Sequence, residues 1–378
     1  MNKSFVFGVA VTNENFTGRK LESRRLRMDF EEGINTILIS PRRWGNTSLV
    51  KHVCTQMKND GSDVITVYLD IFGCKNEYEF YNALATAVCQ QTASRRQLWW
   101  EEAKDFLARL SPRISVSPEP NAGFSVSLGI TPQTHTPEQV LSLVEDIAIR
   151  KGKRIVVCID EFQQIGEFAD SKSVQARLRS VWQHQQMTSY CLFGSKRHHM
   201  SSIFLDKSMP FYQFGELFWL TKIPVEEWVP YIISHFEASG RNISEALAMR
   251  ICETVDCFSA YVQQLAWHLL LHVEKGEEAN GALLELAIND LLTSNEMLFM
   301  QLVEPLSAYQ MNFIRAIISG YHSKFNEKNV RARFDLGAPS NLVRLREALI
   351  ERDIIYSEQK QLFVSDPVFA IWFRRKFM

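Results

Sequence analysis

One short stretch has the spacing of a phosphate-binding loop, in which backbone amides surround an anion, a Lys reaches the β and γ phosphates and a hydroxyl holds Mg²⁺. The stretch reads Ser-Pro-Arg-Arg-Trp-Gly-Asn-Thr from residue 40 to residue 47. Gly45 and Thr47 match the pattern G-x-x-x-x-G-K-[ST]. Ser40 stands in place of the first Gly, and Asn46 stands in place of the Lys. Only part of the pattern is kept, so by itself it does not predict a nucleotide site.

A pair of acids supplies what else such a site needs. Asp160 and Glu161 end an apolar run about 110 residues after the loop. In this arrangement the Asp completes the Mg²⁺ sphere through water, and the Glu polarises the water that attacks the phosphate. Acids at the end of a strand are common in any α/β sheet. The loop upstream is what favours the functional interpretation of this pair.

The loop and the acids require a sheet that holds them at one edge. Apolar runs predict five strands, at 34–39, 64–70, 154–160, 189–195 and 214–223. Strands that alternate with helices indicate a parallel sheet, and the run 154–160 is apolar on both faces, as expected of a central parallel strand. We therefore expect an α/β domain over residues 1–223, with a hairpin insertion at about 113–130.

The rest of the chain is predicted to be helical and then to form a winged helix. Apolar residues recur at helical spacing through 224–305, which predicts a helical domain. From 306 to 378 the order is a helix, a loop, a second helix at 340–353 and a strand pair at 354–366. This is the order of elements in a winged helix.

The composition is that of a folded protein without a membrane span. The chain has 378 residues, of which 46% are apolar and 22% charged, and it has no apolar run approaching the roughly 18 residues that a bilayer crossing needs. No export signal is evident at the N-terminus. The seven cysteines are an odd number without a C-x-x-C pair. We therefore expect a cytoplasmic protein with reduced thiols and no metal held by protein ligands alone.

The net charge of −1 conceals a basic C-terminal segment. Residues 306–378 hold 12 Lys and Arg against 7 Asp and Glu. These cations could meet DNA phosphates, yet Glu347, Glu351 and Asp353 lie in the expected recognition helix and repel DNA. A surface that docks a protein client is the alternative, and no side chain is predicted to read bases. The cations are Arg331, Arg333, Arg344, Arg346, Arg374, Arg375 and Lys376.

Six ordered motifs resemble those of the archaeal-type ATPase family of the AAA+/STAND group, including its bacterial members. They are Phe16-Thr17-Gly18-Arg19, ISPRRWGNTSLV, VVCIDEFQQI, LFGSKRHHM, MPFYQFGELFWL and DPVFAIWFRRKF, and together they span nearly the whole chain. The resemblance implies a P-loop NTPase core that binds ATP and Mg²⁺, a helical lid domain and a C-terminal winged-helix domain. This organisation agrees with the elements predicted above.

The resemblance also implies roles for individual residues. Asp160 would be the Walker B acid, Glu161 the catalytic acid, and Ser195 the sensor of the γ phosphate. Arg19 would border the adenine, although a surface Arg beside a turn Gly is the alternative. The remaining nucleotide contacts would be Arg42, Arg43, Trp44, Gly45, Asn46, Thr47 and Ser48, and Thr47 and Asp160 would hold Mg²⁺.

Asn46 departs from the family, whose members usually carry Lys there. A charge-assisted hydrogen bond is worth about 1.5–3 kcal/mol, against about 1 kcal/mol for a neutral one. The loss should be larger in the transition state, because charge on the phosphoryl oxygens is redistributed there. We therefore expect an ATP-binding, nucleotide-dependent switch with impaired hydrolysis. The alternative is a pseudo-ATPase scaffold whose winged helix binds protein or DNA independently of nucleotide.

Overall fold

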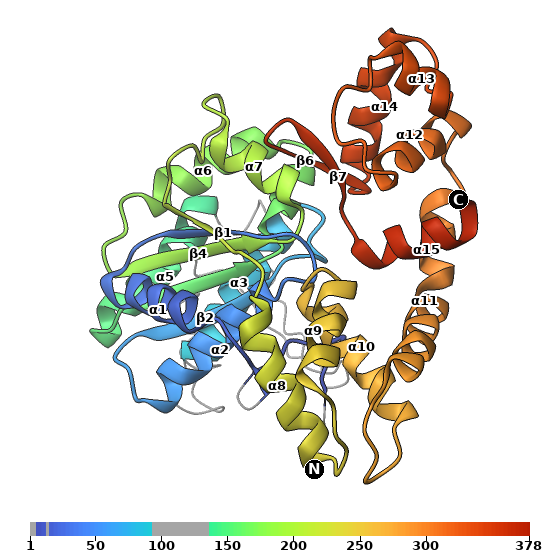
Figure 1. Cartoon of the computed structure of the whole chain (residues 1–378). Helices are drawn as coiled ribbons and strands as arrows, with labels where there is room; N and C mark the ends of the chain where they lie inside the picture. The colour runs from blue at the N-terminus through green and yellow to red at the C-terminus, as the bar shows by residue number, and fades with distance from the viewer. Residues whose placement is uncertain (1–4, 13–14, 93–135) are drawn as a thin grey trace, which may run out of the picture. The chain divides into compact units, whose positions relative to one another are not determined.

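The structure is a computed structural model that describes residues 5–12, 15–92 and 136–378. These residues form two compact units (Figure 1). The first unit is Ala10–Thr221, and the second combines the N-terminal residues through Val9 with Lys222–Met378. The hairpin predicted at about 113–130 lies outside the described residues. The domain boundaries predicted after residues 223 and 305 stay predictions.

The first unit is built on a five-stranded sheet with the order β2-β3-β4-β1-β5, in which every strand pair is parallel. The five predicted strands are thus confirmed. The chain leaves β1 for the edge strand β2, returns through β3 and β4 to one side of β1, and then crosses to β5 on the other side. The strand order therefore reverses at β1. Parallel sheets bind ligands at the carboxyl ends of their strands near such a reversal. The bounds are β1 Thr36–Ile39, β2 Ile65–Asp70, β3 Ile155–Asp160, β4 Thr188–Gly194 and β5 Glu216–Trp219.

Helices cover both faces of this sheet. Val156 and Cys158 of β3 lie in one buried cluster with α1 and α2, whereas Ile155, Val157 and Ile159 lie in a second cluster on the other face. Every residue of β3 is buried, as its sequence predicted. The first face is covered by α1 (Lys20–Glu32) and α2 (Asn46–Asn59). The second is covered by α3 (Glu77–Thr92), α5 (Pro137–Lys151), η2 (Phe162–Glu167), α6 (Ser171–Trp182) and α7 (Arg197–Leu205).

The second unit begins with a helical segment, as predicted. Phe5 from the N-terminal residues packs against Tyr231 and Phe236 of α8, with ring centroids 6.2 and 6.0 Å apart. This contact explains why the start of the chain belongs to the second unit. Among the described residues, no helix has both the length and the apolarity needed to span a bilayer. The helices are α8 Val225–Ala238, α9 Glu245–Thr254, α10 Ser259–His272 and α11 Gly281–Val303.

The C-terminal part of this unit has the predicted order of helix, helix and hairpin. Two helices form that the sequence did not predict: α15 (Pro367–Phe377), which follows the hairpin, and α13 (Lys328–Phe334), where we expected only a loop. Helix α13 has seven residues, of which Val330 alone is buried, so its sequence carries no apolar stripe to predict it. The other elements are α12 Ala308–Ile318, α14 Pro339–Glu351, and the antiparallel strands β6 Ile355–Glu358 and β7 Gln361–Val364.

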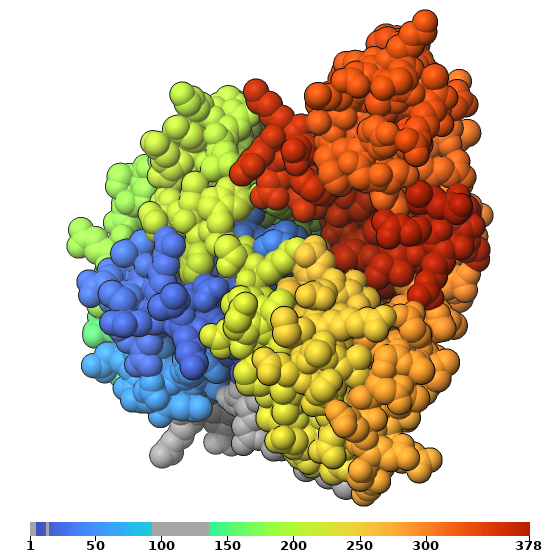
Figure 2. Space-filling model, in the orientation of Figure 1, coloured from blue at the N-terminus to red at the C-terminus, as the bar shows by residue number. Residues whose placement is uncertain are grey.

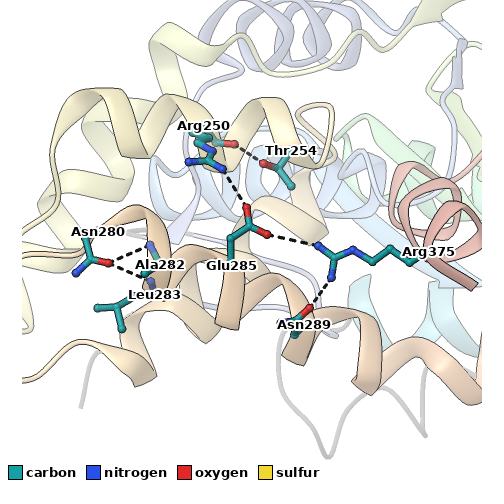
Figure 3. Close-up of polar contacts among 8 residues, drawn as sticks. All are labelled: Arg250, Thr254, Asn280, Ala282, Leu283, Glu285, Asn289 and Arg375. Carbon is teal, nitrogen blue, oxygen red and sulfur yellow. Dashed lines mark hydrogen bonds and ion pairs between the residues drawn. The ribbon is translucent and has the colours of Figure 1, made fainter.

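The last helix of the chain packs against α11. Phe299 of α11 contacts Phe369 of α15, with ring centroids 5.5 Å apart, and the atoms of α15 (red) lie beside those of α11 (orange) in Figure 2. Glu285 of α11 lies between two arginines, with N–O distances of 2.9 Å to Arg250 of α9 and 3.5 Å to Arg375 of α15 (Figure 3). The end of the winged-helix segment is therefore fastened to the helical segment.

Candidate functional site

The phosphate-like loop follows β1 and turns sharply before α2 begins. Arg43 and Gly45 both have left-handed backbone, with φ of 69° and 91°. A Cβ built on Gly45 meets only the Ser48 Cβ, at 4.0 Å, so the backbone angle rather than lack of space requires Gly there. Asn46 is the first residue of α2. The unpaired amides of the first turn of α2, which attract anions, therefore lie next to the loop.

Asn46 folds back onto this turn. Its Oδ1 accepts a hydrogen bond of 2.8 Å from the backbone N–H of Thr47. The residue is 7% exposed, and its Nδ2 has no hydrogen-bond partner within the described part of the chain. One amide of the turn is therefore occupied by the side chain that stands in place of the Lys, and one buried donor is left over.

Thr47 joins the loop to the acids. Its hydroxyl donates a hydrogen bond of 2.8 Å to Oδ2 of Asp160 at the end of β3, and Oδ1 of the same carboxylate accepts from the Glu161 N–H at 2.9 Å. Tyr68 of β2 donates from its hydroxyl to the same Oδ2 at 2.7 Å. Burial raises the pKa of Asp160, and the hydrogen bonds from Tyr68 and Thr47 oppose that rise. The structure thus brings together the loop and Asp160, which are far apart along the chain.

Glu161 is held by two donors. Its backbone is left-handed, with φ of 55°. Its Oε1 accepts a hydrogen bond of 3.0 Å from the hydroxyl of Ser195, which follows β4, and its Oε2 accepts a short hydrogen bond from the side-chain amide of Gln163. A Cβ on Gly194 would lie 1.8 Å from Gln163 Oε1, so a larger residue there would force this amide to move. The two predicted catalytic residues are therefore in direct contact.

The other predicted residues lie around the loop in different ways. Arg19 is buried, and its guanidinium donates at 3.0 Å both to the Trp44 carbonyl and to Glu22. The Ser48 hydroxyl accepts a hydrogen bond of 2.9 Å from the Val11 N–H. Arg19 thus supports the backbone of the loop, and the alternative of a surface Arg is wrong. Arg42 is exposed, whereas Arg43, Trp44 and Gly45 are partly buried.

Sequence analysis missed two residues that touch the acids, Tyr68 and Gln163. Gln163 follows Glu161 by two positions, so its closeness to the acid could have been suspected. Tyr68 lies in β2, in register with Cys158 rather than with Asp160. The Lys51 ammonium also lies 4.2 Å from the centroid of the Tyr68 ring. No local pattern signals this contact, because it depends on which strand lies next to β3.

Comparison with known proteins agrees with these observations. Residues 297–375 match a family model described as "Probable winged helix domain". No curated protein sequence matches the chain. A solved Walker-type ATPase of Pyrococcus abyssi is 18% identical with a TM-score of 0.71, over 98% of this chain and all of the other. The ORC2 protein of Aeropyrum pernix, in its ADPNP–ADP complexes, is 13% identical with a TM-score of 0.56, over 96% of this chain and 97% of its own.

At these identities the likeness establishes the fold. The similarity in fold to these two proteins extends over almost the full length of each chain. The winged helix predicted at the C-terminus is confirmed by the family match. The chain therefore has the P-loop NTPase fold, with a winged-helix domain over residues 297–375.

Proposed function

We propose that this protein binds ATP with Mg²⁺ at the loop of residues 40–48, hydrolyses it slowly, and acts as a nucleotide-dependent switch. The observation that carries the proposal is the contact between the Thr47 hydroxyl and the Asp160 carboxylate, 2.8 Å apart. It unites the first turn of α2 with the acid at the end of β3. The ADPNP and ADP named for the similar ORC2 protein support an adenine nucleotide as the ligand.

The residues present fit a Mg²⁺ ion. A hydroxyl and a carboxylate are the hard oxygen ligands that Mg²⁺ prefers, and it commonly keeps waters between itself and a carboxylate. We therefore assign Thr47 and Asp160 to the ion. When bound, Mg²⁺ neutralises negative charge on the β and γ phosphates. Arg19, through the Trp44 carbonyl, holds the loop backbone in place for the phosphates.

Two features of the site are expected to slow hydrolysis. Asn46 brings a neutral amide to the place where a Lys ammonium would meet the phosphates, and the difference is greatest in the transition state. Glu161, which would polarise the attacking water, already accepts hydrogen bonds from Ser195 and Gln163 on its two oxygens. These bonds hold the carboxylate toward Ser195 and Gln163, so the attacking water must use one of the lone pairs that remain.

A second candidate, a scaffold that does not bind nucleotide, is favoured by one specific observation. The Asn46 side chain occupies the Thr47 N–H, which is one of the amides that would receive a phosphate. Binding of ATP therefore requires Asn46 to release this amide. In a scaffold the contact would be permanent, and the partner of the winged helix would be bound whether or not ATP is present.

The cations of the winged helix favour a protein client over DNA. Five of the seven predicted phosphate contacts bond within the chain itself: Arg331, Arg333, Arg374, Arg375 and Lys376. Arg344 and Arg346 lie exposed on α14, beside the exposed Glu347 and Glu351. A cation must leave its partners within the chain before it can contact a phosphate. The acids beside Arg344 and Arg346 repel the DNA backbone.

Calorimetric titration with ATP, in Mg²⁺ and in EDTA, tests the proposal. We expect Mg²⁺ to strengthen binding, and Thr47→Ala to remove most of that gain, which is about 10- to 100-fold for a hydrogen bond worth about 1.5–3 kcal/mol. Thr47→Ser keeps the hydroxyl and serves as the matched control. Glu161→Gln should retain binding and abolish turnover. Absence of binding at millimolar ATP in the unaltered protein would establish the scaffold instead.

A further inference from the structure

Two cysteines lie at the C-terminal end of α9, in the second unit. The Asp256 N–H donates to the Glu253 carbonyl at 3.2 Å, and the Cys257 N–H donates to the Cys252 carbonyl at 2.8 Å. Asp256 is left-handed, with φ of 50°. These two bonds and this backbone angle define a Schellman motif, in which the chain turns back over the last turn of the helix.

The motif determines which side chains meet. In a Schellman motif the second residue beyond the cap contacts the third residue before it, commonly through apolar side chains. Here those two positions are Cys257 and Cys252, so the motif brings their side chains together over the last turn of α9. Cys252 is buried, whereas Cys257 is partly exposed. The Cys257 thiol can therefore be reached from solvent, and the buried Cys252 thiol lies next to it.

The charges around Cys257 are mixed. The Cys252 thiol, as hydrogen-bond donor, lowers the pKa of Cys257, and the ammonium of Lys222 acts in the same direction. Burial and the carboxylates of Asp256 and Glu226 oppose them, but the pKa of Cys257 remains below its ordinary value. The Lys222 Nζ lies 2.5 Å from Oδ2 of Asp256, so the positive charge of Lys222 stays near the Cys257 thiol. The pKa of Cys252 is raised, chiefly by the hydrogen bond to Cys257.

We propose that Cys257 and Cys252 are a modification site, at which hydrogen peroxide or a similar hydroperoxide forms an intramolecular disulfide. Thiolates that are accessible and lie next to a second thiol are the ones that undergo this chemistry. A second pair, Cys54 and Cys158, has sulfurs 3.8 Å apart and also joins a partly exposed thiol to a buried one. The hydrogen bond to Cys158 and burial raise the pKa of Cys54, so the Cys54 thiol stays protonated and is less reactive than Cys257.

The reaction balances in two steps. The Cys257 thiolate attacks one oxygen of hydrogen peroxide, the O–O bond breaks, and a sulfenic acid and hydroxide form. The Cys252 sulfur then attacks the Cys257 sulfur, its thiol proton passes to the departing hydroxide, and water leaves. Overall two thiols lose two protons and two electrons to the peroxide, which is reduced to two waters. The product links the end of α9 to the residue before Phe258, which caps α10.

Alkylation and mass spectrometry of the full chain test this inference directly. Trypsin cleaves after Arg250 and Lys275 and releases one peptide, 251–275, which contains both cysteines and no other. After peroxide treatment we expect this peptide to resist alkylation and to be lighter by two hydrogens, and a dithiol reductant should reverse both changes. The peptides with Cys54 and Cys158, alkylated after unfolding, are the internal control and should stay reduced.

Single variants separate the roles of the two thiols. Cys252→Ser should leave Cys257 reactive but without a disulfide, so that it accumulates oxygen adducts. Cys257→Ser should leave Cys252 unreacted. In the unaltered protein, alkylation of Cys257 should rise with pH through a midpoint below the value of about 8.5 for a free thiol. The proposal is overturned if peptide 251–275 remains fully alkylated after peroxide, or if Cys257→Ser is oxidised as readily as the unaltered protein.

Discussion

Two neighbouring parts of the sheet edge differ in how completely their polar atoms are bonded. In the acid half, defined as Asp160, Glu161 and Ser195, each carboxylate oxygen accepts a hydrogen bond. In the phosphate half, defined as residues 40–48, the buried Ser40 Oγ and Asn46 Nδ2 have no partner among the residues that the structure describes. Buried polar atoms in native proteins are nearly always bonded. Ser40 and Asn46 are also the two residues that depart from the phosphate-loop pattern, and each of them leaves a buried polar atom without a partner in the described ranges.

Asn46→Lys, which restores the Lys of the phosphate half, should have the largest effect on activity. If the acid half is competent, Asn46→Lys should raise turnover about 100-fold, because one preorganised donor aimed at developing charge contributes about 10²- to 10³-fold. The substitution also removes the side chain that occupies the Thr47 N–H. Phosphate release under single-turnover conditions measures the change.

Two controls show where such a gain arises. Asn46→Gln lengthens the side chain without adding charge, so it should leave turnover within a few fold of the unaltered protein. Asn46→Lys combined with Glu161→Gln should be as inactive as Glu161→Gln alone. Unchanged turnover in Asn46→Lys would mean that the acid half is also deficient. The two halves would then not differ in the way described.

Removing the Tyr68 hydroxyl should disturb the acid half in a pH-dependent way. Burial raises the pKa of Asp160, and the hydrogen bond from Tyr68 restrains that rise, so Tyr68→Phe should raise this pKa further. Mg²⁺ binds the ionised carboxylate, which is lost as pH falls through the pKa. Mg²⁺-dependent binding of ATP should therefore disappear at a higher pH in Tyr68→Phe than in the unaltered protein. Titrations with Mg²⁺ at a series of pH values measure the shift.

A matched tyrosine tests whether this shift is local. The hydroxyl of Tyr81 donates to Glu77 on the same helix, α3, and touches neither acid of the site. Tyr81→Phe also removes a phenol oxygen that is hydrogen-bonded to a carboxylate, yet it should leave the pH dependence of Mg²⁺ binding unchanged. An equal shift in both variants would trace the effect to general loosening of the sheet unit.

The sheet could be predicted from sequence more fully than the contacts inside the site. Residues 154–160 revealed a central strand because helices cover both of its faces, and the loop and acids could be placed at its edge by topology alone. Tyr68 could not be placed beside Asp160, since the contact depends on the lateral pairing of β2 with β3. Arg19 was expected beside the nucleotide, but only the structure reveals its contact with the Trp44 carbonyl.

The same small substitution in the two halves should have opposite effects on stability, and these are the smallest changes we expect. Ser40→Ala removes a buried hydroxyl that has no partner, so the free energy of unfolding should stay the same or rise by up to about 1 kcal/mol. Ser195→Ala removes a donor from the Glu161 carboxylate and should lower the free energy of unfolding by about 1 kcal/mol. Urea unfolding of the two variants measures both values. Equal losses would mean that the Ser40 hydroxyl is bonded in solution, for instance to water, and that the phosphate half is as well satisfied as the acid half.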